Sequence, residues 1–564
     1  MQVYISGVIL FGEVMLMKKQ SFIQGAIILI IANTISKILG AVFKIPLAYI
    51  LKEEGMAIFN ASFGAYIMLL SFITSGVPTA ISKKTAEYCA RKKGKEILGL
   101  VKTSEILMLA AGIAGTLILY FCADFLAVFV GDEQTAPCMR VLSPSVLFVA
   151  VGVVYKSYFQ GVRNMTPTAV SQVTEAIIKL VLGYIFAIYF APFGTVYAAS
   201  GAVLGVTVGE VAATFILWLM YTADRRTYKI SGVKNEPEMM ADIVKFSLPL
   251  IITAGIAGII SMADVSLIRH CLEIIKFDAY SAERIFVKYN GFTNLFDDVH
   301  AALKIGEEGA RWLYGAYSGY AMTVFHLPVG IIGVFGVSIL PVIAGAVELG
   351  DKKRAARMIS VALRCANLIA MPCFVIMLML SSEILYMLFK NTASAGMLSA
   401  VAYCVIPASV ITVTSAVLQA SGKIMLPFRN MLAGAAVKFV LDYILITNPY
   451  INILGAPLSA AADLSICAAL NMISVGKHIG MKYDNMKIFF KPLLSAVVMG
   501  IFIFFIKPVV NASFGGIIMP LFIIIASGAA VYAGMIFVTG SITLKETEIL
   551  RKRRSGEENI PLIK

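Results

Sequence analysis

The sequence contains about fourteen apolar runs of roughly twenty residues, and this feature restricts the fold more than any other. A helix needs about twenty apolar residues to cross a hydrocarbon core of about 30 Å. The 564 residues are 59% hydrophobic and 14% charged, which fits neither a water-soluble domain nor a disordered chain. The chain is therefore predicted to be an all-α, multi-pass membrane protein. The predicted spans are residues 22–44, 59–80, 101–122, 141–160, 168–190, 195–220, 246–268, 318–343, 358–379, 396–419, 429–447, 453–475, 489–508 and 515–539.

An internal repeat relates the two halves of the chain. The stretch Tyr158–Ile185, YFQGVRNMTPTAVSQVTEAIIKLVLGYI, recurs imperfectly as Val417–Ile444, VLQASGKIMLPFRNMLAGAAVKFVLDYI. Three polar positions match at one constant offset: Gln160 with Gln419, Lys179 with Lys438, and Tyr184 with Tyr443. Apolar repeats of about half a chain are typical of transporters with two helix bundles around a central site. We predict two pseudo-symmetric lobes around a central cavity.

Lysine and arginine concentrate in the even-numbered connections between these runs. They are Lys83, Lys84, Arg91, Lys92, Lys93, Lys95, Lys156, Arg163, Arg225, Arg226, Lys229, Lys352, Lys353, Arg354, Arg357, Lys423, Arg429, Lys477, Lys482 and Lys487. The odd-numbered connections, such as 131–138, 191–194 and 448–454, are short and nearly free of basic residues. By the positive-inside rule the even connections and both termini are predicted to be cytoplasmic.

The net charge of +14 does not indicate nucleic-acid binding, because the basic residues are shared among many loops instead of one soluble face. No GxxxxGK[ST] phosphate loop occurs, which argues against ATP as a direct energy source. The eight cysteines include no CxxC pair and the four histidines are dispersed, so neither a metal site nor a cofactor is predicted. These features favour an ion-driven or potential-driven device over an enzyme.

The spans and connections predict six segments. They are an N-terminal extension 1–21, an N-lobe 22–224, a cytoplasmic linker 225–245, a C-lobe 246–476 with an external insertion 271–316, two further helices 477–540, and a basic tail 541–564. Residues 1–16 precede Met17-Lys18-Lys19, which resembles a second start, so we interpret them as an upstream extension. The mixed charge of the insertion suits surface helices at the membrane interface or a lid.

Ionisable residues inside the spans are costly in hydrocarbon and are the first candidates for a functional site. Asn33, Lys37 and Lys44 are spaced by four and seven, which places them along one helical face. Lys37 falls beyond the middle of its span and is expected to line an internal cavity, whereas Lys44 is close enough to a helix end to snorkel. Asp264 and Arg269, five residues apart, are expected on different faces of the seventh span.

Carboxylates inside the spans supply the ion-coupling candidates. Glu210 and Asp463 fall near the middle of the sixth and twelfth spans, where an unpaired carboxylate would protonate or meet a cation. Glu175 lies four residues before Lys179, and Lys438 four before Asp442, so each pair has the spacing of neutralising ion pairs on one helix. Each carboxylate is alternatively part of a packing-bound pair.

Four motifs carry a resemblance to a known family: SKILGAVFKIPLA (36–48), SGVPTAISK (75–83), YFQGVRNMTPTAVSQVTEAIIK (158–179) and YGAYSGYAM (314–322). They resemble the stage V sporulation protein B and lipid II flippase (MurJ-like) family of the multidrug/oligosaccharidyl-lipid/polysaccharide (MOP) exporter superfamily. The similarity runs over residues 17–540. It implies fourteen helices in two lobes and outward movement of polyprenyl-diphosphate-linked cell-wall precursors, in peptidoglycan or spore cortex synthesis.

The resemblance also assigns residues. Lys37 and Lys44 stand where the family has basic residues facing the cavity, and Asp264 stands at its polar position on the seventh helix. Both basic positions are lysine here, so they attract a diphosphate as point charges and not as bidentate guanidinium groups. The implied partners are a lipid-linked oligosaccharide, the bilayer and cell-wall synthesis proteins. The alternatives are a multidrug cation antiporter of the MATE type, which would need carboxylates where Lys37 and Lys44 stand, and an assembly factor that does not transport.

The charge alternation predicts the membrane topology. A cysteine introduced at 191–194 should react with an impermeant thiol reagent added outside intact cells, and one introduced at 223–234 only after permeabilisation. Reversed labelling would overturn the predicted orientation.

Overall fold

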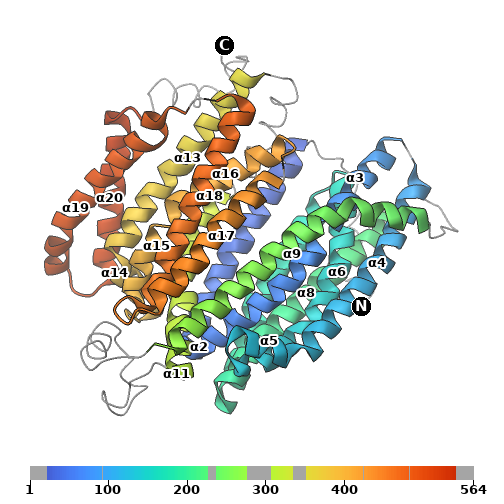
Figure 1. Cartoon of the computed structure of the whole chain (residues 1–564), viewed down its shortest axis with the longest axis horizontal. Coiled ribbons are helices and arrows are strands. Elements are labelled where there is room, and N and C mark those ends of the chain that lie inside the picture. The colour runs from blue at the N-terminus through green and yellow to red at the C-terminus, as the bar shows by residue number, and fades with distance from the viewer. Residues whose placement is uncertain are drawn as a thin grey trace, which may run out of the picture. The chain divides into compact units, whose positions relative to one another are not determined.

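The computed structural model describes residues 22–91, 93–225, 237–275, 306–333, 351–423, 425–481 and 483–541, and its described elements are all helical (Figure 1). These residues divide into two compact units, which are considered separately. Unit 1 comprises residues up to Gly330 together with Ala435–Ser459, and unit 2 comprises Ile331–Gly434 and the residues from Ala460 onward. The segment boundaries predicted from the sequence stay a prediction, and the extension, the basic tail and most of the insertion lie outside the described residues.

The long helices of unit 1 are α2 (Phe22–Thr74), α3 (Val77–Ala90), α4 (Gly94–Phe121), α5 (Ala123–Val130), α6 (Ala136–Gly161), α7 (Thr166–Phe190), α8 (Thr195–Arg225), α9 (Pro237–Glu273) and α11 (Gly306–Gly315). Shorter turns are η1 (Glu133–Thr135), η2 (Ala191–Phe193), η5 (Ala316–Ala321) and η6 (Asn452–Leu454). Unit 2 contains α13 (Lys352–Met379), α14 (Ser381–Phe389), α15 (Ala395–Ala402), α16 (Val405–Ala420), η7 (Met486–Phe490), α19 (Lys491–Ser513) and α20 (Ile518–Val538). Helices α17 (Met425–Ile446) and α18 (Gly455–Ile479) each contribute to both units.

Helix α2 carries the first two predicted spans as two arms. Its backbone leaves the helical region at Lys52, where φ is 52° and ψ is −164°. Lys44 on the first arm hydrogen-bonds Asn60 on the second, although sixteen residues of straight helix would separate them by about 24 Å. The chain therefore folds back at Lys52, between the two spans predicted at 22–44 and 59–80. This bend brings polar side chains of both arms together.

The two copies of the sequence repeat have the same local structure. In the first copy α6 ends at Gly161 and α7 begins at Thr166, and in the second α16 ends at Ala420 and α17 begins at Met425. Equivalent backbone hydrogen bonds close both turns: Arg163 to Gln160 and Asn164 to Phe159 in the first, Gly422 to Gln419 and Lys423 to Leu418 in the second. Arg163 and Gly422 both have positive φ. The repeat therefore preserves a helix–turn–helix at the level of individual backbone bonds.

Ten described helices are long and apolar enough to cross a membrane, or eleven when the bent pair α15 and α16 counts as one span. Three of the fourteen predicted spans are not counted separately. The two arms of α2 count once, α17 carries three charged residues, and the predicted span 318–343 is described only to residue 333. The all-α membrane class is confirmed, and the number fourteen stays a prediction.

Glycines allow α7 and α8 to approach closely in unit 1. A Cβ atom added at Gly205 would lie 2.2 Å from the Cα atom of Gly183, and one at Gly201 would lie 2.5 Å from the carbonyl oxygen of Phe186. Both obstacles are backbone atoms, which cannot move aside as a side chain can. Gly205 therefore keeps α8 against α7, the helix that carries Glu175 and Lys179.

We expect Gly205→Ala to destabilise the protein by at least about 1–3 kcal/mol, because the new methyl group overlaps the α7 backbone. The melting temperature of the purified protein in detergent measures this effect. Gly534→Ala in α20 is the matched control, since an added Cβ there meets nothing within 4 Å. Equal melting temperatures for the two variants would contradict the packing argument.

Candidate functional site

Three of the predicted site residues lie on the first arm of α2. Lys37 is exposed, and its Nζ atom donates to the carbonyl oxygen of Gly330 at 3.5 Å. Lys44 is half-buried and donates to Asn60 Oδ1 at 3.2 Å. Asn33 is half-buried one turn before Lys37. The Lys37 and Lys44 ammonium groups have neutral acceptors and, among the described residues, no carboxylate within ion-pair distance.

Two groups not predicted as site residues join this cationic region. Lys179 on α7 places its ammonium over the rings of Phe63 and Phe43, 5.0 and 5.9 Å from their centroids. Lys44 is close enough to Lys179 for the two positive charges to repel each other. The positive charges of Lys37 and Lys44 both act on the imidazole ring of His326. We call Lys37, Lys44 and Lys179 the lysine cluster. It is contributed by α2 and α7 of unit 1.

The expected ion pair between Glu175 and Lys179 is not formed. The Glu175 carboxylate instead lies 3.9 Å from Nζ of Lys156 on α6, because the neighbouring helix brings that ammonium nearer than the same-helix spacing does. Glu210 on α8 is close enough to Glu175 for the two carboxylate charges to repel each other. The neighbouring Gly209 packs against the backbone of α7, where an added Cβ atom would lie 3.1 Å from the carbonyl oxygen of Glu175. The structure thus brings together two of the three ion-coupling candidates.

Asp264 is half-buried and forms an ion-pair triad with two buried residues, Lys438 and Asp442. The Lys438 ammonium, with 8% of the residue exposed, pairs with Asp264 on α9 and, at 2.6 Å, with Asp442 on its own helix. The Ser459 hydroxyl donates to Asp442. The pair between Lys438 and Asp442 agrees with their four-residue spacing. These bonds attach the segment 435–459 to α9 within unit 1.

Arg269 is also fully buried, and it pairs with Asp132, at 2.6 Å, rather than with Asp264. Asp264 and Arg269, five residues apart on α9, therefore have different partners, which agrees with the prediction that they lie on different helical faces. Asp132 also accepts from Arg311 of α11 at 3.0 and 3.1 Å. Burial lowers the pKa of Arg311, but its hydrogen bonds to Asp132 outweigh this and raise the pKa above its usual value. Arg269 does not belong to the lysine cluster.

Asp463 on α18 is separate from the other ion-coupling candidates. It lies in unit 2, where a Cβ atom added at Gly434 would come within 2.2 Å of its Oδ1 atom. The carboxylate is therefore packed against the backbone of α17. No group of three potential metal ligands occurs within the described ranges.

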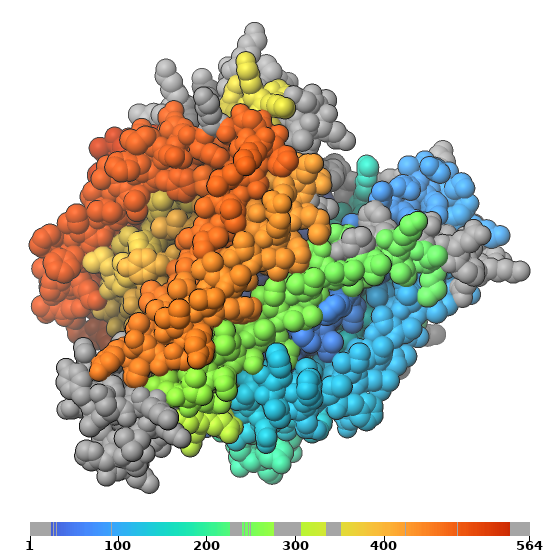
Figure 2. All heavy atoms as spheres, viewed as in Figure 1, coloured from blue at the N-terminus to red at the C-terminus, as the bar shows by residue number. Residues whose placement is uncertain are grey.

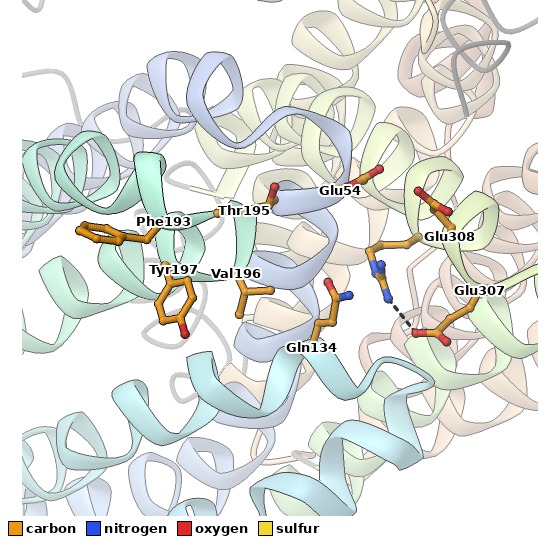
Figure 3. Close-up of a pocket in the computed structure, with 10 residues that line it drawn as sticks. Glu54, Gln134, Phe193, Thr195, Val196, Tyr197, Glu307 and Glu308 are labelled. Carbon is orange, nitrogen blue, oxygen red and sulfur yellow. Dashed lines mark hydrogen bonds and ion pairs between the residues drawn. The ribbon is translucent and has the colours of Figure 1, made fainter. Parts of the chain in front are cut away.

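A cavity of about 690 Å³ opens at one end of unit 1 (Figure 3). Its lining includes three glutamates, Glu54, Glu307 and Glu308, and the guanidinium of Arg311. In Figure 3 the dashed line joins Glu307 to the arginine, which is the ion pair Arg311–Glu307 at 2.7 Å. The acidic lining distinguishes this cavity from the lysine cluster.

Sequence reasoning located Lys37 and Lys44 but missed Lys179, Asp132 and Arg311 as interacting groups. Lys179 was assigned to Glu175 because the four-residue spacing suggested a pair. Asp132 lies in a short polar connection between two predicted spans. Charged residues are common in such connections, so its charge did not indicate a buried ion pair. Its separation of 137 residues from Arg269 leaves no local signal.

The fold of this chain resembles that of two solved membrane transporters. It superposes on the lipid II flippase MurJ in an inward closed conformation with a TM-score of 0.62, at 16% identity, covering 93% of this chain and 98% of that one. It also superposes on an inward-facing multidrug resistance MATE transporter of the MOP superfamily with a TM-score of 0.61, at 16% identity, covering 79% of this chain and 94% of that one. The chain thus has the fold shared by MurJ and the MATE transporters.

The chain belongs to the polysaccharide biosynthesis protein family, whose model matches residues 22–347, and residues 314–525 match the model of lipid II flippase MurJ. It is 26% identical to stage V sporulation protein B of Bacillus subtilis over 82% of this chain and 85% of that protein. It is 24% identical to lipid II flippase MurJ of the same organism over 82% and 84%. These relatives confirm the predicted family and the predicted location in the cell membrane as a multi-pass protein. The second of these relatives is named as a lipid II flippase, which is a transporter and not an enzyme.

We expect Lys438→Met to destabilise the protein by about 3–5 kcal/mol, because it leaves the fully buried Asp442 and the half-buried Asp264 without their cation. Asp264→Asn should cost less, since the pair between Lys438 and Asp442 remains. The melting temperature in detergent ranks the variants.

Lys487→Met is the control for this ranking, because Lys487 and Asp484 form an exposed pair that solvent screens, so its loss should leave the melting temperature nearly unchanged. Adding Asp264→Asn to Lys438→Met should recover part of the lost stability, since one of the two carboxylates becomes neutral. A double variant less stable than Lys438→Met would contradict the triad's electrostatic role.

Proposed function

We propose that the protein is a flippase that moves a polyprenyl-diphosphate-linked cell-wall precursor across the bacterial cell membrane. The observation that carries this proposal is the lysine cluster, whose three ammonium groups have no carboxylate within ion-pair distance among the described residues. A diphosphate is strongly anionic, and a lysine attracts it more strongly at low dielectric than in water. The cluster therefore suits an anionic headgroup.

The repeat strengthens this interpretation. Lys179 and Lys438 occupy equivalent positions, but Lys438 is neutralised by two carboxylates whereas Lys179 lies over aromatic rings. Aromatic faces stabilise an ammonium without cancelling its charge. The first copy of the repeat thus keeps a positive charge available, while the second copy does not.

Family membership supports the same cargo class. The family is named for polysaccharide biosynthesis, and relatives with similar length include a lipid II flippase and a sporulation protein. We infer alternating access as the mechanism, with the headgroup on the lysine cluster and the lipid tail in the bilayer. Lipid II, another polyprenyl sugar and a spore cortex precursor share the diphosphate that the cluster would bind.

For ion coupling we propose Glu175 and Glu210, which lie near each other and near Lys179, with Asp463 as a separate candidate in unit 2. A carboxyl group there that lost its proton would add a negative charge beside Lys179. Such a change would alter the attraction of the cluster for an anion. This proposal makes proton movement and headgroup binding compete at one site.

A multidrug cation antiporter is the second candidate, because MATE transporters share the fold. The lysine cluster argues against it, since organic cations would meet ammonium groups. Expression in a pump-deficient host distinguishes the two: resistance to several cationic dyes would favour the antiporter. An assembly factor without transport activity would translocate nothing in a reconstituted system.

We expect Lys37→Gln to lower the initial rate of lipid II flipping in proteoliposomes by about tenfold or more, because the diphosphate meets an amide in place of an ammonium. Lys37→Arg retains the charge and should keep most of the activity. The flipping rate is measured with and without an imposed membrane potential. A second assay tests whether each variant complements a flippase-depleted strain.

Lys352→Gln is the matched control, because Lys352 is an exposed lysine in the first turn of α13 and lies outside the lysine cluster. It should flip at the parent rate. Membrane abundance of every variant is checked by blot, since removing Lys37 leaves no buried carboxylate unpaired and should not reduce insertion. Full activity of Lys37→Gln at equal abundance would refute the electrostatic role of this residue.

A further inference from the structure

The buried cluster around Asp132 has no role in the proposed binding of cargo. Asp132 follows Gly131, the residue with positive φ that ends α5, and its carboxylate is fully buried. It accepts from Arg269 at the end of α9 and, with both oxygens, from Arg311 of α11. One carboxylate therefore joins three elements that are far apart in the sequence.

A second bond holds the same end of α9. The Ser266 hydroxyl, one turn before Arg269, donates to the carbonyl oxygen of Phe129 in α5. Directional polar bonds therefore attach the end of α9 to α5 and to the turn that follows it. In Figure 2, α9 is the green ridge on the visible face of unit 1.

Two glycines earlier in α9 pack closely against α2. Added Cβ atoms would lie 2.1 Å from the Phe72 ring at Gly255 and 3.0 Å from the Cα atom of Met68 at Gly258. The atom nearest to a Cβ atom at Gly258 is the Ser71 Oγ atom, at 2.5 Å, so both glycines lie close against α2. The cluster around Asp132 is one directional attachment of α9, and the ion pair between Asp264 and Lys438 is another.

Arg269 is incompletely satisfied in this arrangement. Its Nε and Nη2 atoms are buried and have no hydrogen-bond partner in the described parts of the chain. The Oε1 atom of Glu273 is buried and unpartnered as well, and Glu273 lies one turn after Arg269 on α9. A Cβ atom at Gly131 would lie 3.6 Å from both Glu273 Oε1 and Arg269 Cβ. A second carboxylate therefore stands within reach of the same guanidinium.

We propose that Asp132, Arg269 and Arg311 form a latch that holds α9 against α5, and that Arg269 exchanges Asp132 for Glu273 when the latch opens. The exchange keeps the guanidinium paired in both states, which avoids the cost of a buried lone charge. Two alternative pairings of one arginine make a two-state element. The unpartnered Nε and Nη2 atoms of Arg269 and the unpartnered Oε1 atom of Glu273 lower the stability of the closed state, so that it can open.

Spin labels on α5 and α9 test the latch by double electron–electron resonance. In a cysteine-free background, Val128→Cys and Ile274→Cys place labels at exposed positions of the two ends. The parent should show mainly one short distance. Asp132→Asn should raise the ratio of a longer to the shorter distance by at least about tenfold, because it removes the charge that binds both arginines.

Asp124→Asn is the matched control, because Asp124 lies on α5, the helix labelled at Val128, and forms an exposed pair with Arg140. It should leave the distance distribution unchanged. If Asp132→Asn also leaves it unchanged, the latch is refuted. Should Asp132→Asn fail to fold, Arg311→Gln removes one arginine from the cluster, and the same ratio should rise by a smaller factor. An unchanged ratio in that variant would equally refute the latch.

Glu273→Gln tests the exchange separately. It leaves the closed latch intact and removes the alternative partner, so the longer distance should become rarer than in the parent. An unchanged distribution would overturn the exchange while leaving the latch. None of these measurements requires cargo, so their outcome is independent of the proposed flippase activity.

Discussion

The free-energy cost of a charge in hydrocarbon determines how this protein uses its few intramembrane ionisable residues. Lys438 is buried and is balanced by Asp264 and Asp442. Lys37, Lys44 and Lys179 instead contact a carbonyl oxygen, an amide and two aromatic rings. Neutral acceptors stabilise an ammonium locally and leave its charge to act on a ligand. The same residue type therefore serves as a sealed structural ion pair in one place and as a candidate anion site in another.

The repeat shows how this difference arises without a change of backbone. Both copies close their helix–turn–helix with equivalent hydrogen bonds, and each places a lysine at the same position of its second helix. Gly183 of the first copy occupies the position of Asp442 in the second. A glycine there lets α8 approach α7, whereas an aspartate neutralises the lysine one turn earlier. One substitution thus affects both packing and charge.

The shared fold does not decide what is transported. MurJ and MATE transporters superpose on this chain about equally well. One fold supports several functions. The choice of cargo must therefore depend on the side chains that the helices carry. In this chain the lysine cluster favours an anionic cargo, while the latch around Asp132 concerns the movement of α9. Cargo recognition and conformational control thus use separate charged groups of unit 1.

The sequence alone determined the membrane class, the helix–turn–helix repeat, the family and the break in α2, because apolar length, repetition and motifs are local properties of the chain. It also placed Lys37 and Lys44 among the site candidates. The partners of the charges were decided only by tertiary structure. Glu175 pairs with Lys156 across two helices instead of with Lys179 on its own helix, and Asp132 meets Arg269 from 137 residues away. Helical spacing describes neighbours on one helix, but an ion pair in a bundle forms with whichever opposite charge the packing of other helices brings within reach.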